Sequence, residues 1–121
     1  MPDIRIRQAD FRCHCEDHLL VLFSDLPSLS GSGNIHYKLV IVIFRRSDQE
    51  IEGLITLEQS ESMSNAFCIF NESGKHENFG ELPDENAFGA FLSGAGILLR
   101  DKFGIDTSGD WEPVVPATDL N

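Results

Sequence analysis

The chain of 121 residues carries 20 acidic and 9 basic side chains, a formal net charge of −11 at pH 7. This balance argues against direct binding to nucleic acid, because such binding relies largely on neutralisation of phosphates by lysine and arginine. The longest apolar run, residues 39–44, is too short to cross a bilayer, so no membrane segment is expected. A chain of this length suits a single domain, which we expect over residues 1–121.

The part of the chain before residue 71 is predicted to form strands, because its apolar residues either alternate with polar ones or occur in short continuous runs. The expected strands are 3–15 with a bulge at 8–10, 19–23, 36–46, 51–58 and 66–70. Residues 36–46 and 51–58 are predicted to pair as a hairpin. Residues 24–35 and 71–82 are predicted to be polar connections.

Residues 83–104 give the clearest helix signal. Pro83 suits the first turn, where its missing N–H costs nothing, and Gly104 suits the left-handed residue that ends a helix. Acidic residues 84–85 and basic residues 100 and 102 match the helix dipole. The apolar side chains expected to pack on a sheet recur at spacings of three and four. They are Phe88, Phe91, Leu92, Ala95, Leu99 and Phe103.

These patterns together predict an α+β fold. We expect an antiparallel sheet of about five strands with one long C-terminal helix packed on one face, followed by an irregular tail over residues 106–121. Because the strands at 19–23 and 39–44 are apolar on both faces, one helix cannot cover them fully. The second face would then need a cover, for which the Trp111 tail, a curled sheet and a second copy of the chain are the alternatives.

A second copy is the favoured cover, because large bare apolar faces are rare in soluble monomers and twofold homodimers are the commonest oligomers. We therefore predict a homodimer. The predicted contact residues lie on the middle strand and on a helix face of small side chains, and they are Val40, Val42, Gly89, Ser93 and Gly96.

Cys13, His14, Cys15 and His18 have the composition of a zinc-ligand set. On a strand, however, Cys13 and Cys15 face one way and His14 faces the other, and the CxxC spacing of structural zinc sites is absent. Cys68 would add a third thiol if its strand lay alongside. We expect no metal and no cofactor, and we interpret the cysteines as small apolar side chains. Their odd number fits free thiols in a reducing compartment, so a cytoplasmic location is predicted.

No catalytic motif of known spacing is found, and no catalytic residue is assigned. Residues 1–46 contain six basic and five acidic side chains, whereas residues 47–121 contain three and fifteen. We therefore favour a non-catalytic binding protein, of inhibitor or immunity type, that presents its acidic C-terminal half to a basic protein partner.

Two alternatives to this function stay open. One is a small-ligand-binding protein with an apolar pocket between sheet and helix. Its lining would be Phe11, Phe44, Phe70, Phe88 and Phe91. The other, less favoured, is a small enzyme whose site has no recognisable sequence signature. A well-formed pocket with convergent polar groups would support either of them.

Overall fold

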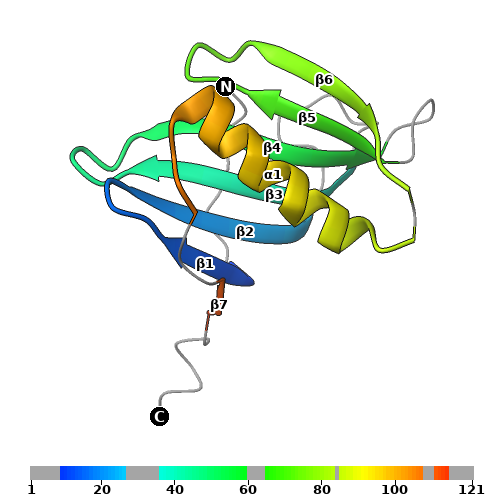
Figure 1. Cartoon of the computed structure of the whole chain (residues 1–121), viewed down its shortest axis with the longest axis horizontal. Coiled ribbons are helices and arrows are strands. Elements are labelled where there is room, and N and C mark those ends of the chain that lie inside the picture. Colours follow the sequence, from blue (N-terminus) through cyan, green and yellow to red (C-terminus); the bar gives the residue numbers. More distant parts are fainter. Residues whose placement is uncertain (1–8, 27–35, 60–64, 84, 108–110, 115–121) are drawn as a thin grey trace.

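The computed structural model describes residues 9–26, 36–59, 65–83, 85–107 and 111–114. Their strands form a seven-stranded antiparallel sheet in the order β6-β5-β4-β3-β2-β1-β7 (Figure 1). The strands are β1 Phe11–His14, β2 His18–Leu26, β3 His36–Arg45, β4 Ile51–Gln59, β5 Ala66–Phe70, β6 His76–Glu81 and β7 Glu112–Pro113, and the helix is α1 Ala87–Phe103. The predicted α+β class is confirmed, whereas the sheet has seven strands rather than about five.

The two additional strands lie in segments that were predicted to be a polar connection and an irregular tail. β6 pairs with β5 through Phe70 and His76, and β7 pairs with β1 through Arg12 and Glu112. Neither strand has the apolar alternation from which the other strands were predicted. They are held by backbone pairing to a neighbour, a contact that leaves no pattern in side-chain polarity.

The central strands agree with the prediction from sequence. β3 and β4 form the expected hairpin, with His36 opposite Gln59 and Phe44 opposite Ile51. β5 coincides with the predicted strand, and β2 covers 19–23 but continues to Leu26, so the following connection begins later than expected. Most of that connection, residues 27–35, lies outside the described residues, as does Gln8 in the predicted bulge.

Helix α1 crosses one face of the sheet, in front of β3 and β4 in Figure 1. It begins later than predicted, because Asn86 has a left-handed φ of 56° that a right-handed helix cannot include. Glu85 therefore precedes the helix, Asp84 lies outside the described residues, and the first turn contains no acidic residue. Within the described part of the chain, no helix combines the length and apolar character needed to cross a membrane.

The end of α1 is as predicted. Gly104 is left-handed, with φ 67°, and its N–H donates to Arg100 O at 3.2 Å. The N–H of Ile105 donates to Leu99 O at 2.9 Å, and the Ile105 side chain is buried in the core. Glycine adopts this conformation without the Cβ clash that other residues meet, so the helix ends here.

The face of the sheet under α1, which we call the helix-covered face, is packed with apolar side chains from every strand from β1 to β5. The buried members are Cys13, Leu20, Leu22, Leu39, Ile41, Ile43, Ile55, Leu57, Phe67, Ile69, Phe91, Ala95, Leu98, Leu99 and Ile105. Most of the predicted helix contacts join this core, but Phe88 is 44% exposed. Trp111 also packs against this face, so it does not cover the other one.

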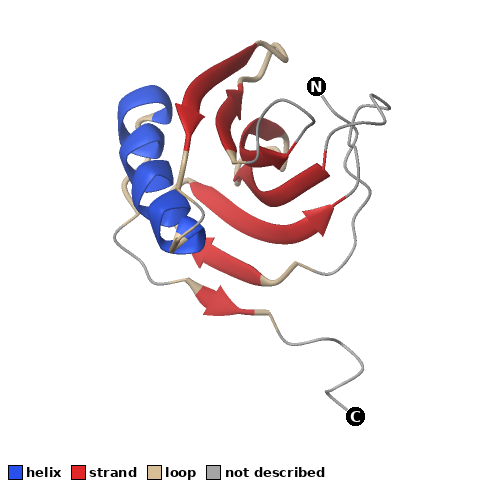
Figure 2. Ribbon diagram, turned by 90° about the vertical axis from the view of Figure 1, so that its right-hand side faces the viewer, coloured by secondary structure: helices blue, strands red, loops and turns tan. Residues whose placement is uncertain are grey.

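The opposite face of the sheet, which we call the helix-free face, has a second buried cluster of Phe23, Tyr37, Val40, Val42 and Leu54. The pairing of β3 with β4 shifts register between Tyr37 and Leu39, which explains why Tyr37 joins Val40 and Val42. Such irregularities increase local twist, and Figure 2 shows the strands strongly curved, with α1 on one side. This face is therefore not bare within the single chain.

Candidate functional site

The turns that join β1 to β2, β3 to β4 and β5 to β6 lie at the same end of the sheet (Figure 1). They comprise residues 15–17, 46–50 and 71–75, and we call this region the turn end. Loops carried by a rigid sheet are frequent positions for binding residues, because the scaffold fixes their geometry. The turn end is therefore a candidate binding surface.

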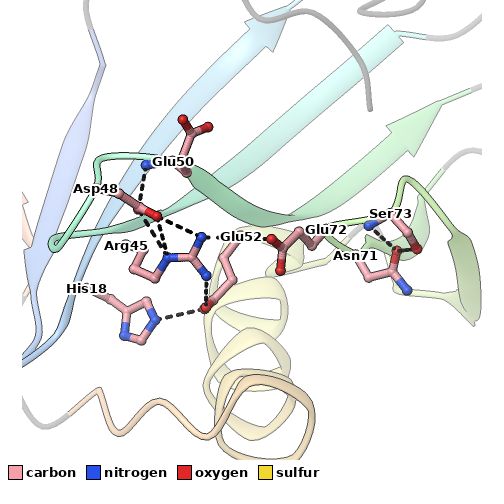
Figure 3. Close-up of polar contacts among 8 residues, drawn as sticks. All are labelled: His18, Arg45, Asp48, Glu50, Glu52, Asn71, Glu72 and Ser73. Carbon is pink, nitrogen blue, oxygen red and sulfur yellow. Dashed lines mark hydrogen bonds and ion pairs between the residues drawn. The ribbon is translucent and has the colours of Figure 1, made fainter.

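Arg45, the last residue of β3, is the centre of a polar network at the turn end (Figure 3). Its Nε and Nη2 donate to the Asp48 carboxylate at 3.1 and 3.0 Å. Its Nη1 donates to Glu52 Oε1 at 3.3 Å, and Nη2 lies 3.8 Å from Glu72 Oε1. The other carboxylate oxygen of Glu52 lies 2.7 Å from His18 Nε2. The Arg45 guanidinium thus connects the turn at 46–50 with β4 and with the turn at 71–75, and through Glu52 it also reaches β2.

The contact between Arg45 and Asp48 changes the protonation equilibria of both groups. The hydrogen bond to Asp48, followed by the charge of that carboxylate, raises the pKa of Arg45. The hydrogen bond from Arg45, followed by that from the Glu50 N–H, lowers the pKa of Asp48. Both groups stay charged at neutral pH, and as a surface pair they fix the geometry of the turn more than they stabilise the fold.

Arg46 connects the same turn to its other neighbour. Its backbone N–H donates to Asp17 O at 3.0 Å, and its Nε donates to Cys15 O at 3.1 Å. Its Nη2 lies 2.7 Å from His14 Nδ1. Since Arg45 reaches one neighbouring turn and Arg46 the other, all the turns of this end are joined by side-chain contacts.

The turn end is acidic. Residues 15–17, 46–50 and 71–75 contain five acidic and two basic side chains, and the adjacent Arg45 is already surrounded by carboxylates. A hollow of about 500 Å³ opens between two of the turns. It is lined by Asp17, His18, Arg45, Arg46, Ser47 and Glu52. Asp17 is exposed at this hollow, whereas both Glu52 carboxylate oxygens already contact Arg45 and His18.

The candidate metal ligands chosen from sequence are dispersed. Cys13 is buried on the helix-covered face, His14 is exposed beside Arg46, and His18 contacts Glu52. Burial raises the pKa of Cys15, which also favours a neutral thiol. Cys68 lies on β5, and β4, β3 and β2 separate it from β1, so it does not join the other cysteines.

The five predicted pocket phenylalanines lie on both faces of the sheet and do not line one cavity. Phe91 is fully buried in the helix-covered core, whereas Phe44 and Phe70 pack on the helix-free face. Phe11 and Phe88 are neighbours, with ring centroids 6.3 Å apart. These two line a hollow of about 320 Å³ together with Asp10, Leu22, Ser24 and Leu39.

The residues predicted to form a dimer contact do not form one surface: some are buried in the sheet and others are exposed or partly exposed on α1. Val40 and Val42 are 0% and 1% exposed within the single chain, so neither is available at the surface. On α1, Ser93 is exposed, whereas Gly89 and Gly96 are partly exposed. The helical glycine that permits close packing is Gly94, because a Cβ there would lie 3.1 Å from the Phe67 ring.

Sequence reasoning missed a polar cluster on the helix-free face. Thr56 and Glu58 alternate with apolar residues of β4, and they are 0% and 5% exposed. The Thr56 hydroxyl donates to Glu58 Oε2 at 2.6 Å, and His76 Nε2 lies 3.3 Å from the same oxygen. Cys68 adjoins them, and burial, then the charge and hydrogen bond of Glu58, raise its pKa to about 12. Such a thiol is a poor nucleophile at neutral pH.

The sequence does contain a signal for the turn end, namely the close succession of basic and acidic residues at 45–52.

No protein-family model matches this chain, and no curated protein or solved structure shows significant similarity to it. Its function is therefore inferred from the geometry and charge of its own residues.

Proposed function

We propose that this protein is a non-catalytic binding protein whose acidic turn end contacts a basic partner protein. The observation that carries the proposal is the network of Arg45 and Arg46, which holds the acidic turns together as one surface. A surface that is already ordered loses little conformational freedom on binding, and this favours affinity. Its carboxylates would attract lysine and arginine side chains and accelerate encounter with them.

The exposed acids that are not bound to Arg45 are the ones available to such a partner. Glu16, Asp17 and Glu50 are exposed and come from neighbouring turns. A surface of this kind would suit an inhibitor or immunity protein that neutralises a basic partner.

A charge-reversal experiment tests the proposal. The variant Glu16→Lys/Glu50→Lys changes two exposed acids of the turn end without touching the contacts of Arg45. The matched control Glu85→Lys/Asp101→Lys makes the same change in net charge at exposed positions elsewhere. Each protein is immobilised and used to capture binders from an extract of its own host at low and moderate salt, and the affinity of any retained protein is then measured by calorimetry.

We expect the wild type and the control to retain the same basic protein, and the turn-end variant to bind it at least about tenfold more weakly. Binding should weaken as salt is added, because the attraction between exposed charges is screened. Equal losses in both variants would contradict the proposal, since the effect would then follow net charge alone. Retention of an acidic protein, no retention, or full retention by the turn-end variant would contradict it as well.

Binding of a small apolar ligand is the second candidate function, supported by the hollow between Phe11 and Phe88. A fluorescent apolar probe tests it: Phe88→Ala should abolish a saturable signal, and Ile97→Ala, at an exposed position of the same helix, should leave it unchanged. A signal that does not saturate, or that is the same in all three proteins, contradicts a site.

The homodimer and the cytoplasmic location stay predictions. With Val40 and Val42 buried inside one chain, the dimer no longer follows from a bare apolar face. Light scattering at micromolar concentration tests it, and a mass of 13.5 kDa would contradict it. All three cysteines are free thiols, as a reducing compartment favours, and imaging of the tagged protein in its host tests the location.

A further inference from the structure

Three neighbouring strands bring together one carboxylate, one thiol and one imidazole on the helix-free face. Glu58 comes from β4, Cys68 from β5 and His76 from β6. One possible ligand atom of each residue lies within 4.8 Å of the others. Because the residues belong to hydrogen-bonded strands, the sheet itself holds their backbone positions.

The contacts of the side chains fix their orientation. The Thr56 hydroxyl donates to Glu58 Oε2 at 2.6 Å, and His76 Nε2 lies 3.3 Å from that oxygen. The His76 ring stacks on Phe70, with centroids 4.6 Å apart and an interplanar angle of 25°. A ligand whose ring is already oriented loses little freedom when it binds a metal.

Two of the three groups in the cluster are buried. Glu58 is 5% exposed and Cys68 is 0% exposed. Among the described residues, Glu58 forms an ion pair with His76, which is charged only when it is protonated. A buried carboxylate is costly without a nearby positive charge, and a dication supplies more of it than an imidazolium does. The His76 side chain is 43% exposed, which gives solvent a route to the cluster.

We propose that Glu58, Cys68 and His76 bind a divalent transition metal ion of the zinc type. A thiolate, an imidazole and a carboxylate are together a donor set that zinc accepts in a tetrahedral site. Ligand atoms around tetrahedral zinc are about 3.5 Å apart, close to the 3.3 Å between His76 Nε2 and Glu58 Oε2. The Cys68 sulfur lies within 4.8 Å of both atoms. The fourth position would face the exposed side of His76 and take water.

The proposed site differs from the cluster considered in the sequence, where no metal was expected. Cys13, His14, Cys15 and His18 are near one another in the chain but turn to different surroundings. Glu58, Cys68 and His76 lie on three consecutive strands and are brought together by strand pairing. Binding would release the thiol proton of Cys68, because the thiolate is the form that ligates metal.

Cobalt(II) is a suitable probe, because it occupies zinc sites and gives a charge-transfer band when a thiolate coordinates it. The metal-free full chain is titrated with Co²⁺ under reducing, oxygen-free conditions, and Zn²⁺ is then added to displace it. The test variants are His76→Gln, at a largely exposed position, and Cys68→Ser. The matched controls are His14→Gln and Cys15→Ser, which change the same residue types outside the cluster.

We expect one Co²⁺ per chain with a thiolate band in the wild type and in both controls. His76→Gln should weaken binding by about 100-fold or more, since even the loss of an indirect partner of a metal ligand costs 10- to 100-fold. Cys68→Ser should abolish the band. The proposal is overturned if the wild type shows no thiolate band, if His76→Gln binds like the wild type, or if Cys15→Ser removes the band. His76→Gln keeps the test decisive even if Cys68→Ser does not fold.

Discussion

Under α1 the sheet contributes only apolar side chains to the core, whereas the opposite face combines Val40 and Val42 with buried Thr56 and Glu58. Apolar burial is non-directional and needs only a suitable volume. A buried hydroxyl or carboxyl needs a partner at a defined distance and angle, so its position is much more constrained. The difference indicates that packing under α1 is set mainly by volume, whereas the polar residues of the helix-free face are positioned by directional contacts.

The largest expected effect is on the helix-covered face. Phe91 is 0% exposed and packs edge-on against Phe67, with ring centroids 5.6 Å apart. Replacing Phe91 with alanine should lower the free energy of unfolding by about 3–5 kcal/mol, because it removes apolar contacts and leaves a cavity. Urea unfolding followed by circular dichroism measures this change.

The matched control for Phe91→Ala is Ile97→Ala, in the same helix. Ile97 is 58% exposed, so its replacement should change the free energy of unfolding by less than about 0.5 kcal/mol. If both variants were destabilised equally, the helix would not be packed on the sheet as described.

A second prediction concerns the closest approach of α1 to the sheet. A Cβ at Gly53 would lie 2.7 Å from two ring atoms of Phe103 and 2.9 Å from the backbone oxygen of Phe70. Gly53→Ala should therefore destabilise the fold by about 1–3 kcal/mol through overpacking. At Gly96 the nearest atom is Thr107 Oγ1 at 3.7 Å, so Gly96→Ala should stabilise the helix by about 0.5–1 kcal/mol.

Thermal and urea unfolding of the two alanine variants give the sign of each effect. Opposite signs would confirm that the glycine in β4 is required by packing and that the helical glycine is not. A neutral result at Gly53 would mean that the end of α1 lies further from β4 than the described contact.

A third prediction uses pH to examine the helix-free face in metal-free protein. Cys68 has its pKa raised from 9.0 to about 12, first by burial and then by Glu58. Above pH 9 the unfolded chain loses this thiol proton while the folded chain keeps it, so the stability that the thiol contributes falls as pH rises. Between pH 7 and pH 10 the loss should be about 1.4 kcal/mol.

The measurement is the difference in unfolding free energy between the wild type and Cys68→Ser, whose hydroxyl does not ionise in this range. As the pH rises from 7 to 10, the wild type should lose about 1.4 kcal/mol of unfolding free energy relative to Cys68→Ser. If it stays constant, the Cys68 thiol is not in the buried surroundings described here.

The smallest predicted effect is the hydrogen bond inside the polar cluster. Thr56→Val removes the donor to Glu58 while keeping the shape of the side chain, and it should cost about 1 kcal/mol. Thr56→Ser restores a hydroxyl and should recover most of the loss. Equal stability of the valine and serine variants would mean that the hydroxyl makes no stabilising contact. Burial at position 56 would then need no hydrogen-bond partner, as at the apolar positions of this face.

The sequence alone was sufficient for features that depend on a few neighbouring residues. Gly104 ends α1 because glycine tolerates a left-handed backbone, and the apolar runs of β3 and β4 predict a hairpin. The turn end as a whole was not predictable, because it also requires the turn at 71–75, and β6 has no apolar alternation from which to infer it.

The tertiary structure alone decided which residues meet. The alternation of a strand divides its side chains between two faces, but it does not say that both faces will be buried, as they are at Thr56 and Glu58. A register shift moves Tyr37 to the helix-free face, and strand order separates Cys68 from Cys13 while placing it beside His76. These contacts depend on strand order and register, which arise from pairing between distant segments, whereas local sequence patterns report only the conformation of each segment.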